Sequence, residues 1–150
     1  MTSWGTSLVQ PLDYHGILLL PPDYHALVSL EQQIGKQIPV FGDSSTSNIG
    51  YLHRNQHIVV LRLCELGLSS LPEDVCRLPQ LRELYLYANH LSSMPETFGD
   101  LEALERLDIE RNELFFLPKS LGMLSRLTVI WANHNALPHS SHSEEGNGCR

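Results

Sequence analysis

The sequence predicts an α/β repeat protein, in which each short strand is followed by a helical return on the opposite side. Two observations predict this fold. One pattern of apolar residues recurs along the chain at a fixed interval, and each copy begins with alternating apolar residues and continues with apolar residues three to four apart. Alternation buries one face of a strand, whereas the wider spacing suits a loose helical or 3₁₀ turn.

The repeat begins at Ile58 and recurs from Leu81, Leu104 and Leu127, so each start lies 23 residues after the previous one. Three units are complete and the fourth is partial. Each complete unit has apolar residues at places 1, 4, 6, 11, 14, 18 and 21, with proline at place 15. In the second unit these are Leu81, Leu84, Leu86, Leu91, Met94, Phe98, Leu101 and Pro95. The proline fixes φ where the chain begins its return.

Asparagine occupies the ninth place of the later units, as Asn89, Asn112 and Asn135. We expect a stacked column of side-chain amides that satisfies the backbone groups buried after each strand. Three unrelated surface asparagines would not share one phase. The first unit has Leu66 at this place, which fits an end unit with no preceding turn to bridge.

The combined pattern LxxLxLxxNxLxxLP resembles the leucine-rich-repeat family in its 23-residue intracellular form, from residue 58 to about 137. The resemblance implies a right-handed solenoid with a parallel sheet on its concave face and short helices or turns outside. It also implies protein binding as the default activity. The family includes scaffold proteins and regulators of small GTPases and phosphatases, so the resemblance favours a signalling adaptor or scaffold.

Residues 23–57 are predicted to form an N-terminal cap of a helix and a β-hairpin, because a solenoid exposes apolar edges at its ends. The helix should begin at Asp23, whose side chain can cap it, and end at Gly35. Its apolar stripe consists of Leu27, Leu30 and Ile34. Residues 1–22 are left unassigned.

The hairpin is predicted from alternation on either side of a polar break at residues 54–56. Its second strand should become the first strand of the repeat sheet. His53 and His57 flank the expected turn and are predicted to be exposed to solvent.

The repeats are expected over residues 58–138, followed by a disordered tail at residues 139–150. Ser140 stands where an apolar residue belongs, and the tail is polar. Two interpretations of this end stay open: the chain is a shortened relative of a longer solenoid, or another group covers Leu124, Leu127 and Ile130.

Phe115 and Phe116 fill places that are serine in the earlier units. They form either an exposed contact patch or a makeshift packing against the last turn, and the packing interpretation is slightly preferred.

Residues that alternate with the buried leucines should point out of the concave face. Because strands stack in register, Arg62, Tyr85, Asp108 and Trp131 are expected to form the central row across the sheet. Aromatic and arginine side chains dominate interface hot spots, so this face is predicted to bind a partner. The predicted partner-binding residues are Arg62, Glu83, Tyr85, Tyr87, Arg106, Asp108, Glu110, Trp131 and Asn133.

The same alternation also places Val60, Cys64 and Val129 on the concave face. The alternative interpretation of the face is ordinary strand composition with a solvated pair of Arg106 and Glu83.

Composition argues against several function classes. A formal net charge of −7, with ten Lys and Arg spread along the chain, argues against a nucleic-acid grip. No apolar run is long enough to span a membrane. Three cysteines without a CxxC pair indicate neither a disulfide framework nor a zinc knuckle, and they favour a reducing, cytoplasmic location. His139 and His142 have HxxH spacing but no third ligand.

No nucleophile elbow, fixed catalytic triad or phosphate loop is evident. We therefore expect a monomeric, non-enzymatic module that binds a protein and needs neither metal nor cofactor. Two alternatives remain: a recognition fragment related to part of a larger enzyme such as a kinase or ubiquitin ligase, and a gene remnant with too few repeats to fold.

Overall fold

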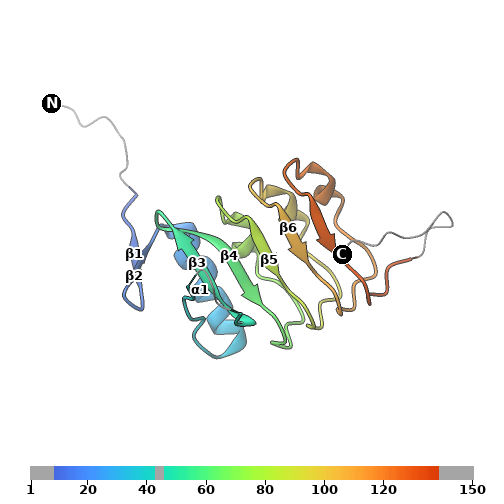
Figure 1. Cartoon of the computed structure of the whole chain (residues 1–150), viewed down its shortest axis with the longest axis horizontal. Coiled ribbons are helices and arrows are strands. Elements are labelled where there is room, and N and C mark those ends of the chain that lie inside the picture. Colours follow the sequence, from blue (N-terminus) through green and yellow to red (C-terminus); the bar gives the residue numbers. More distant parts are fainter. Residues whose placement is uncertain (1–8, 43–45, 139–150) are drawn as a thin grey trace.

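The computed structural model describes residues 9–42 and 46–138, and these contain seven strands, one α-helix and three 3₁₀ helices (Figure 1). In chain order the elements are β1 Leu12–Tyr14, β2 Ile17–Leu19, α1 Pro21–Ile34, β3 Ile49–Arg54, β4 His57–Leu63, η1 Glu73–Arg77, β5 Glu83–Tyr85, η2 Glu96–Asp100, β6 Arg106–Asp108, η3 Lys119–Met123 and β7 Val129–Trp131.

Five strands form one sheet in the order β3-β4-β5-β6-β7. The predicted hairpin is confirmed, since β3 and β4 pair antiparallel, and β4 is also the first strand of the parallel repeat sheet. Leu61, Leu84, Leu107 and Ile130 lie in register across β4 to β7. The first three of them are fully buried, so one face of the sheet is the wall of the core.

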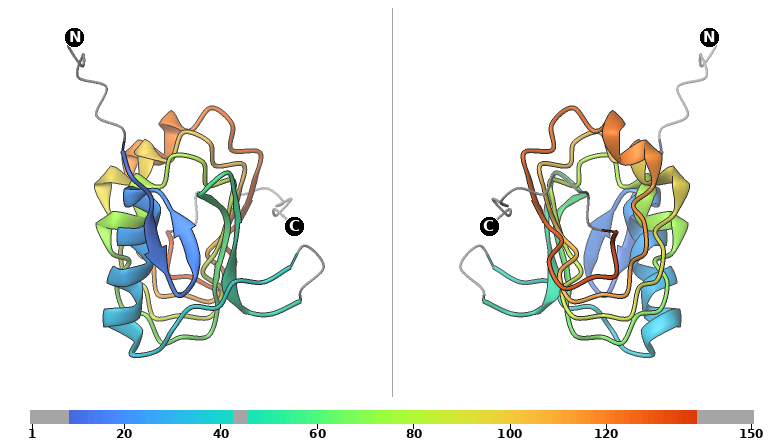
Figure 2. Two further views of the ribbon diagram at one scale, coloured as in Figure 1. Left: turned by 90° about the vertical axis from the view of Figure 1, so that its left-hand side faces the viewer. Right: turned by 90° about the vertical axis from the view of Figure 1, so that its right-hand side faces the viewer.

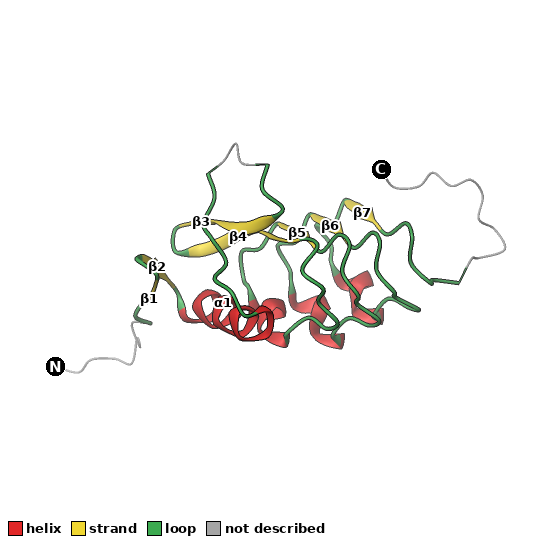
Figure 3. Cartoon of the chain, turned by 90° about the horizontal axis from the view of Figure 1, so that it is seen from below, coloured by secondary structure: helices red, strands yellow, loops and turns green. Residues whose placement is uncertain are grey.

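The return segments lie on the opposite side of the core from the sheet, as Figure 3 shows. Each 3₁₀ helix begins directly after the proline of its unit, and Pro72, Pro95 and Pro118 have φ between −58° and −63°. This φ is the one that a proline ring imposes, so the repeated proline sets the start of each return. The predicted 3₁₀ returns are confirmed. Seen along the stack, successive turns superpose with the strands on one side and the helices on the other (Figure 2).

The predicted asparagine column is confirmed. Asn112 is buried, and its side-chain amide donates to the carbonyl oxygens of Leu86 at 2.9 Å and Ile109 at 3.1 Å. Its Oδ1 accepts the backbone N–H of Leu91, in the preceding turn, at 3.1 Å. Asn89 likewise accepts the N–H of Leu66 at 3.0 Å, so each asparagine serves the turn before its own.

The prediction that Asp23 caps the helix is wrong. α1 begins at Pro21, two residues earlier, and Leu20 occupies the N-cap without a side-chain hydrogen bond. Prolines at the first helical positions have their φ preset and lack the N–H groups that a capping side chain would satisfy. The expected end of the helix is confirmed: Gly35 adopts φ 74° and donates its N–H to Glu31 O at 2.8 Å. Only glycine takes this left-handed conformation without strain.

Asp23 instead joins the helix to the repeat sheet. It is fully buried, accepts the backbone N–H of Ile58 at 2.6 Å, and lies 3.0 Å from Nδ1 of His57. The predicted solvent exposure of His57 is therefore wrong as well, since its side chain is only 21% exposed. The buried carboxylate therefore links α1 to the His57 side chain and the Ile58 N–H at the start of β4.

A second hairpin, β1-β2, lies in the segment that the sequence left unassigned. It contributes Tyr14 and Leu19 to the core, and the Tyr14 hydroxyl donates to Glu31 Oε1 of α1 at 2.5 Å. The backbone N–H of Leu20 then donates to Gln56 O in the β3-β4 turn at 3.0 Å. The hydrophobic core thus extends from this hairpin through α1 into the repeats.

The last turn is less buried than the turns before it. Leu127 and Ile130 are partly exposed, whereas Leu104 and Leu107 at the same places of the third unit are fully buried. The preferred packing interpretation of Phe115 and Phe116 is wrong, because their exposed fractions are 62% and 54%. They follow the buried Leu114 and point away from the core. The predicted tail, with Ser140, His139 and His142, lies outside the described residues.

Candidate functional site

The central row of the concave face forms as the sequence predicts. Arg62 is paired with Tyr85, Tyr85 with Asp108, and Asp108 with Trp131 in the ladders of β4 to β7. All four side chains are partly exposed. One continuous row therefore carries a cation, a phenol, a carboxylate and an indole across the strands.

The β4 end of this row is extended by an aromatic ring that sequence reasoning missed. The guanidinium of Arg62 lies 4.9 Å from the ring centroid of Phe41 and 5.5 Å from that of Tyr85, and its Nη1 donates to Ser47 O at 3.2 Å. Such stacking on aromatic faces is favourable for arginine. Phe41 belongs to no strand, but Gly50 within a predicted strand was a signal that another group approaches closely there.

Replacing Gly50 with alanine is expected to lower the free energy of unfolding by about 2–3 kcal/mol. A Cβ at this position would lie 2.5 Å from Cδ1 of Phe41 and 2.8 Å from Pro39 O, and the backbone φ of 147° is strained for any other residue. Urea denaturation measures the change. Gly42→Ala is the matched control, because its Cβ would meet nothing within 4 Å and its effect should be within about 0.5 kcal/mol. Equal effects of the two substitutions would contradict the close packing of Phe41.

The middle of the face is held by a polar chain. The Tyr85 hydroxyl donates to Glu83 Oε2 at 2.6 Å, and Glu83 Oε1 lies 3.6 Å from Nη1 of Arg106. Partial burial and the bond to the Glu83 carboxylate raise the pKa of Tyr85. The pairing of Arg106 with Glu83, which was the alternative interpretation of these residues, is therefore present, and it also orients Tyr85.

The β7 end of the face is hollowed. Tyr87, Glu110 and Trp131 line this hollow together with Arg111 and His134. The guanidinium of Arg111 lies 5.9 Å from the ring centroid of Tyr87. Three residues predicted for partner binding, one each from three successive turns, thus surround one concavity.

Two further predicted residues, Asp108 and Asn133, belong to the same turns as residues that line this hollow. Asp108 is half-buried, and its Oδ1 accepts the backbone N–H of Glu110 at 3.0 Å. Burial raises the pKa of Asp108 above its usual value. Asn133 is partly exposed on the last turn, where its carbonyl accepts the N–H of Arg111 at 3.0 Å. Neither Asp108 nor Glu110 forms an ion pair with any residue that the structure describes.

Asp108→Asn is expected to stabilise the chain at neutral pH. A carboxyl group whose folded-state pKa is raised favours folding while it is protonated, and this contribution is lost as pH rises through the folded pKa. The amide keeps an oxygen acceptor for the Glu110 N–H but carries no charge. Thermal melts at pH 7 should show a higher Tm for the variant. The difference in Tm between the variant and the natural chain should disappear as the pH falls towards 3.8, the usual pKa of an aspartate carboxyl group. A variant that is less stable at pH 7 and equal at low pH would contradict the direction.

Cys64, which the alternation places on the concave face, is buried with 7% exposure. Its backbone N–H donates to Asn48 O at 3.0 Å, so the segment leading into β3 runs beside this end of β4. Burial raises the pKa of the Cys64 thiol. Val60 and Val129 are partly exposed, as expected.

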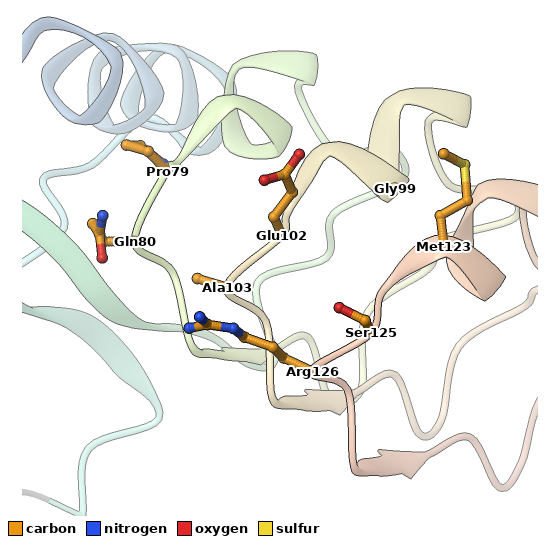
Figure 4. Close-up of a pocket in the computed structure, with 8 residues that line it drawn as sticks. All are labelled: Pro79, Gln80, Gly99, Glu102, Ala103, Met123, Ser125 and Arg126. Carbon is orange, nitrogen blue, oxygen red and sulfur yellow. The ribbon is translucent and has the colours of Figure 1, made fainter.

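Another hollow lies between successive segments that lead from the 3₁₀ helices to the strands (Figure 4). Its lining includes Pro79, Gly99 and Met123, and its charged side chains are those of Glu102 and Arg126. Both charged residues are exposed, and the lining comes from the same part of three successive units. The hollow therefore follows from the stacking of the units.

Within residues 9–42 and 46–138, no three His, Cys, Asp or Glu side chains are grouped closely enough to hold a metal ion. No helix in the described part of the chain has the length and apolar character needed to cross a membrane.

A family model described as leucine rich repeat matches two overlapping stretches, residues 51–114 and 79–137. The chain belongs to the leucine-rich-repeat family. Leucine-rich repeats generally mediate protein–protein interaction, typically without enzymatic activity, and solenoids bind along extended concave surfaces such as the one described above.

A solved leucine-rich-repeat protein of Leptospira interrogans is similar to this chain, with 30% sequence identity and a TM-score of 0.52. The match covers 53% of this chain and 20% of the other, so the chain spans only a small part of that protein's length. No curated protein matches the sequence.

Proposed function

We propose that the chain is a protein-interaction module whose partner lies against the concave face of β4 to β7. The observation that carries this proposal is the central row, in which Arg62, Tyr85, Asp108 and Trp131 stand in register and remain accessible. Aromatic and arginine side chains are the usual anchors of protein interfaces. The opposite face of the same sheet packs on the core, and this rigid support lowers the entropy lost when a partner binds.

The finer features of the proposal follow from the same geometry. α1 contacts η1, and the buried Asp23 joins α1 to β4, which supports a role for residues 23–57 as the N-terminal cap. A right-handed winding is expected from the handedness of crossovers between parallel strands. We further propose that the module acts as a monomeric adaptor or scaffold in the cytoplasm. Cys64 and Cys76 are separate buried thiols, which supports the reducing location alone.

The test is affinity capture with a matched pair of variants. Tyr85→Ala combined with Trp131→Ala should release bound partners, because both rings are accessible anchors. Ser93→Ala combined with Met123→Ala alters exposed residues outside the concave face and should leave capture unchanged. Circular dichroism checks that both proteins are folded. Partners that persist on the first variant, or that are lost from the second, would contradict the proposal.

The second candidate is a recognition part of a larger enzyme. The observation that bears on it is that this chain covers 20% of the matched Leptospira protein, which shows that such repeats occur within longer chains but does not indicate an enzyme. An antibody against the repeats distinguishes the candidates. A cellular band near 16.9 kDa supports the separate module, and a much larger band supports the larger protein.

A further inference from the structure

The aromatic rings of the central row and of the hollow at its β7 end each contact an arginine of the chain, with one exception. Phe41 and Tyr85 flank Arg62, and Tyr87 lies under Arg111. Trp131 has no such cation among the described residues, although an indole is the best ring for this contact. The fold thus leaves open the ring that a cation would prefer.

Two carboxylates that have no counter-ion in the described part of the chain lie near this ring. Asp108 is paired with Trp131 across β6 and β7, and Glu110 lines the same hollow as Trp131 and Tyr87. By contrast, Glu83 on the neighbouring strand already has Arg106, and the exposed Glu113 has His90 at 3.0 Å. Half-burial of Asp108 removes part of its hydration, so a cation brought to it would meet a poorly solvated charge.

We propose that the hollow at the β7 end binds an arginine or lysine side chain of the partner protein, stacked on Trp131 and neutralised by Asp108 and Glu110. This inference rests on the proposed function and names the chemistry of its partner. The partner is a basic segment. The net charge of −7 favours approach by such a segment and disfavours a nucleic acid or an acidic peptide.

Two cationic or titratable residues line the hollow, but within residues 9–42 and 46–138 no cation stacks on Trp131. Arg111 stacks on Tyr87. Arg106 forms an ion pair with Glu83, and these two residues lie in the row next to the central row. His134 lines the hollow but is exposed on the last turn. The stacked arrangement of Arg62 between two rings shows, on the same sheet, the geometry that a partner's guanidinium would adopt over Trp131.

The probe is a library of random 12-residue peptides displayed on phage and selected on the full chain. Selected peptides should be enriched in Arg or Lys. Each is synthesised with arginine and with citrulline, which has a similar shape but no charge, and the citrulline form should bind about tenfold more weakly. Titration of a Trp4→Phe chain, in which Trp131 is the remaining tryptophan, should shift the Trp131 indole N–H signal in NMR spectra.

Variants of the chain locate the contact. Trp131→Leu should weaken the arginine peptide about tenfold, whereas Trp131→Phe should retain part of the affinity. Asp108→Asn with Glu110→Gln should weaken the arginine form and leave the citrulline form nearly unchanged. Glu96→Gln and Glu102→Gln together change the net charge by the same amount at exposed sites outside the hollow and should have little effect.

The possible outcomes test this inference and the proposed function separately. Peptides that lose affinity with Tyr85→Ala but do not depend on a basic residue would overturn this inference and support the proposed function. Basic peptides weakened equally by the Glu96 and Glu102 control would overturn it as well, since that result indicates attraction to net charge alone. Peptides insensitive to every concave-face substitution, or a selection without enrichment, would contradict both proposals.

Discussion

Asn112→Ala is expected to lower the free energy of unfolding by about 2–4 kcal/mol, although it changes no apolar contact of the core. The substitution leaves the buried N–H of Leu91 without the acceptor that Asn112 Oδ1 provides at 3.1 Å. It also removes donors to Leu86 O and Ile109 O, but each of these carbonyls keeps another asparagine, because Asn89 bonds Leu86 O and Asn135 bonds Ile109 O. The unsatisfied N–H is therefore the main cost. Urea denaturation followed by circular dichroism measures the loss.

Two asparagines near the C-terminal end provide the controls. Asn135→Ala should cost less, because Asn135 is only partly buried and the Leu114 N–H that it accepts is nearer to solvent. Asn133→Ala removes a partly exposed amide and should change the stability by less than about 0.5 kcal/mol. If Asn112→Ala were as mild as Asn133→Ala, the amide column would not support the stack, and apolar packing alone would account for the register of the turns.

The repeats could be predicted from the sequence because their buried places recur at one interval. Leu84 and Leu107 stand at the same place and are both fully buried, and the asparagines and prolines mark the turns that follow. The alternation inside each strand also fixed the concave row, so the site residues on β4 to β7 were placed from the same pattern. Repetition supplies several independent copies of each signal, which a single segment lacks.

Other structural features of the repeat are not accompanied by a recurring residue type in the sequence. The residue at the eighth place of each unit has positive φ, between 56° and 59°, but its identity changes from Glu65 to Ala88, Arg111 and His134. Glu65 has this conformation although its unit has Leu66 in place of the asparagine, so the conformation is imposed by the backbone turn rather than by the side chain. Arg111 nevertheless reaches Tyr87 from this place, so a contact at the candidate site depends on a backbone geometry that residue type does not reveal.

The N-terminal hairpin was missed for a related reason. β1 and β2 have three residues each, which is too short for alternation to be distinguished from chance. The signal that could have found them is His15-Gly16, where both residues have positive φ and form the tight turn of the hairpin. Phe41 was missed because Gly50, although it indicates that a group approaches the strand closely, does not say which residue that group belongs to.

Asp23→Ala is expected to lower the free energy of unfolding by about 3 kcal/mol, comparable to the loss at Asn112. The carboxylate is fully buried, and its removal leaves the N–H of Ile58 without its acceptor at 2.6 Å and His57 without its partner at 3.0 Å. Burial raises the pKa of Asp23, because the core destabilises the charged carboxylate. The bonds to Ile58 and His57 oppose this effect. Urea denaturation measures the loss.

A comparison of Asp23→Ser with Asp23→Asn distinguishes this role from helix capping. Serine replaces aspartate well at a helix N-cap, so a capping role would leave Asp23→Ser nearly as stable as the natural chain. As an acceptor for Ile58, the shorter serine hydroxyl cannot span the distance, whereas Asn keeps an oxygen at the same reach. Asp23→Ser should therefore behave like Asp23→Ala, and Asp23→Asn should recover part of the loss. Hydrogen exchange at the Ile58 amide should quicken in the alanine and serine variants, because the contact protects the first repeat strand and not the helix end.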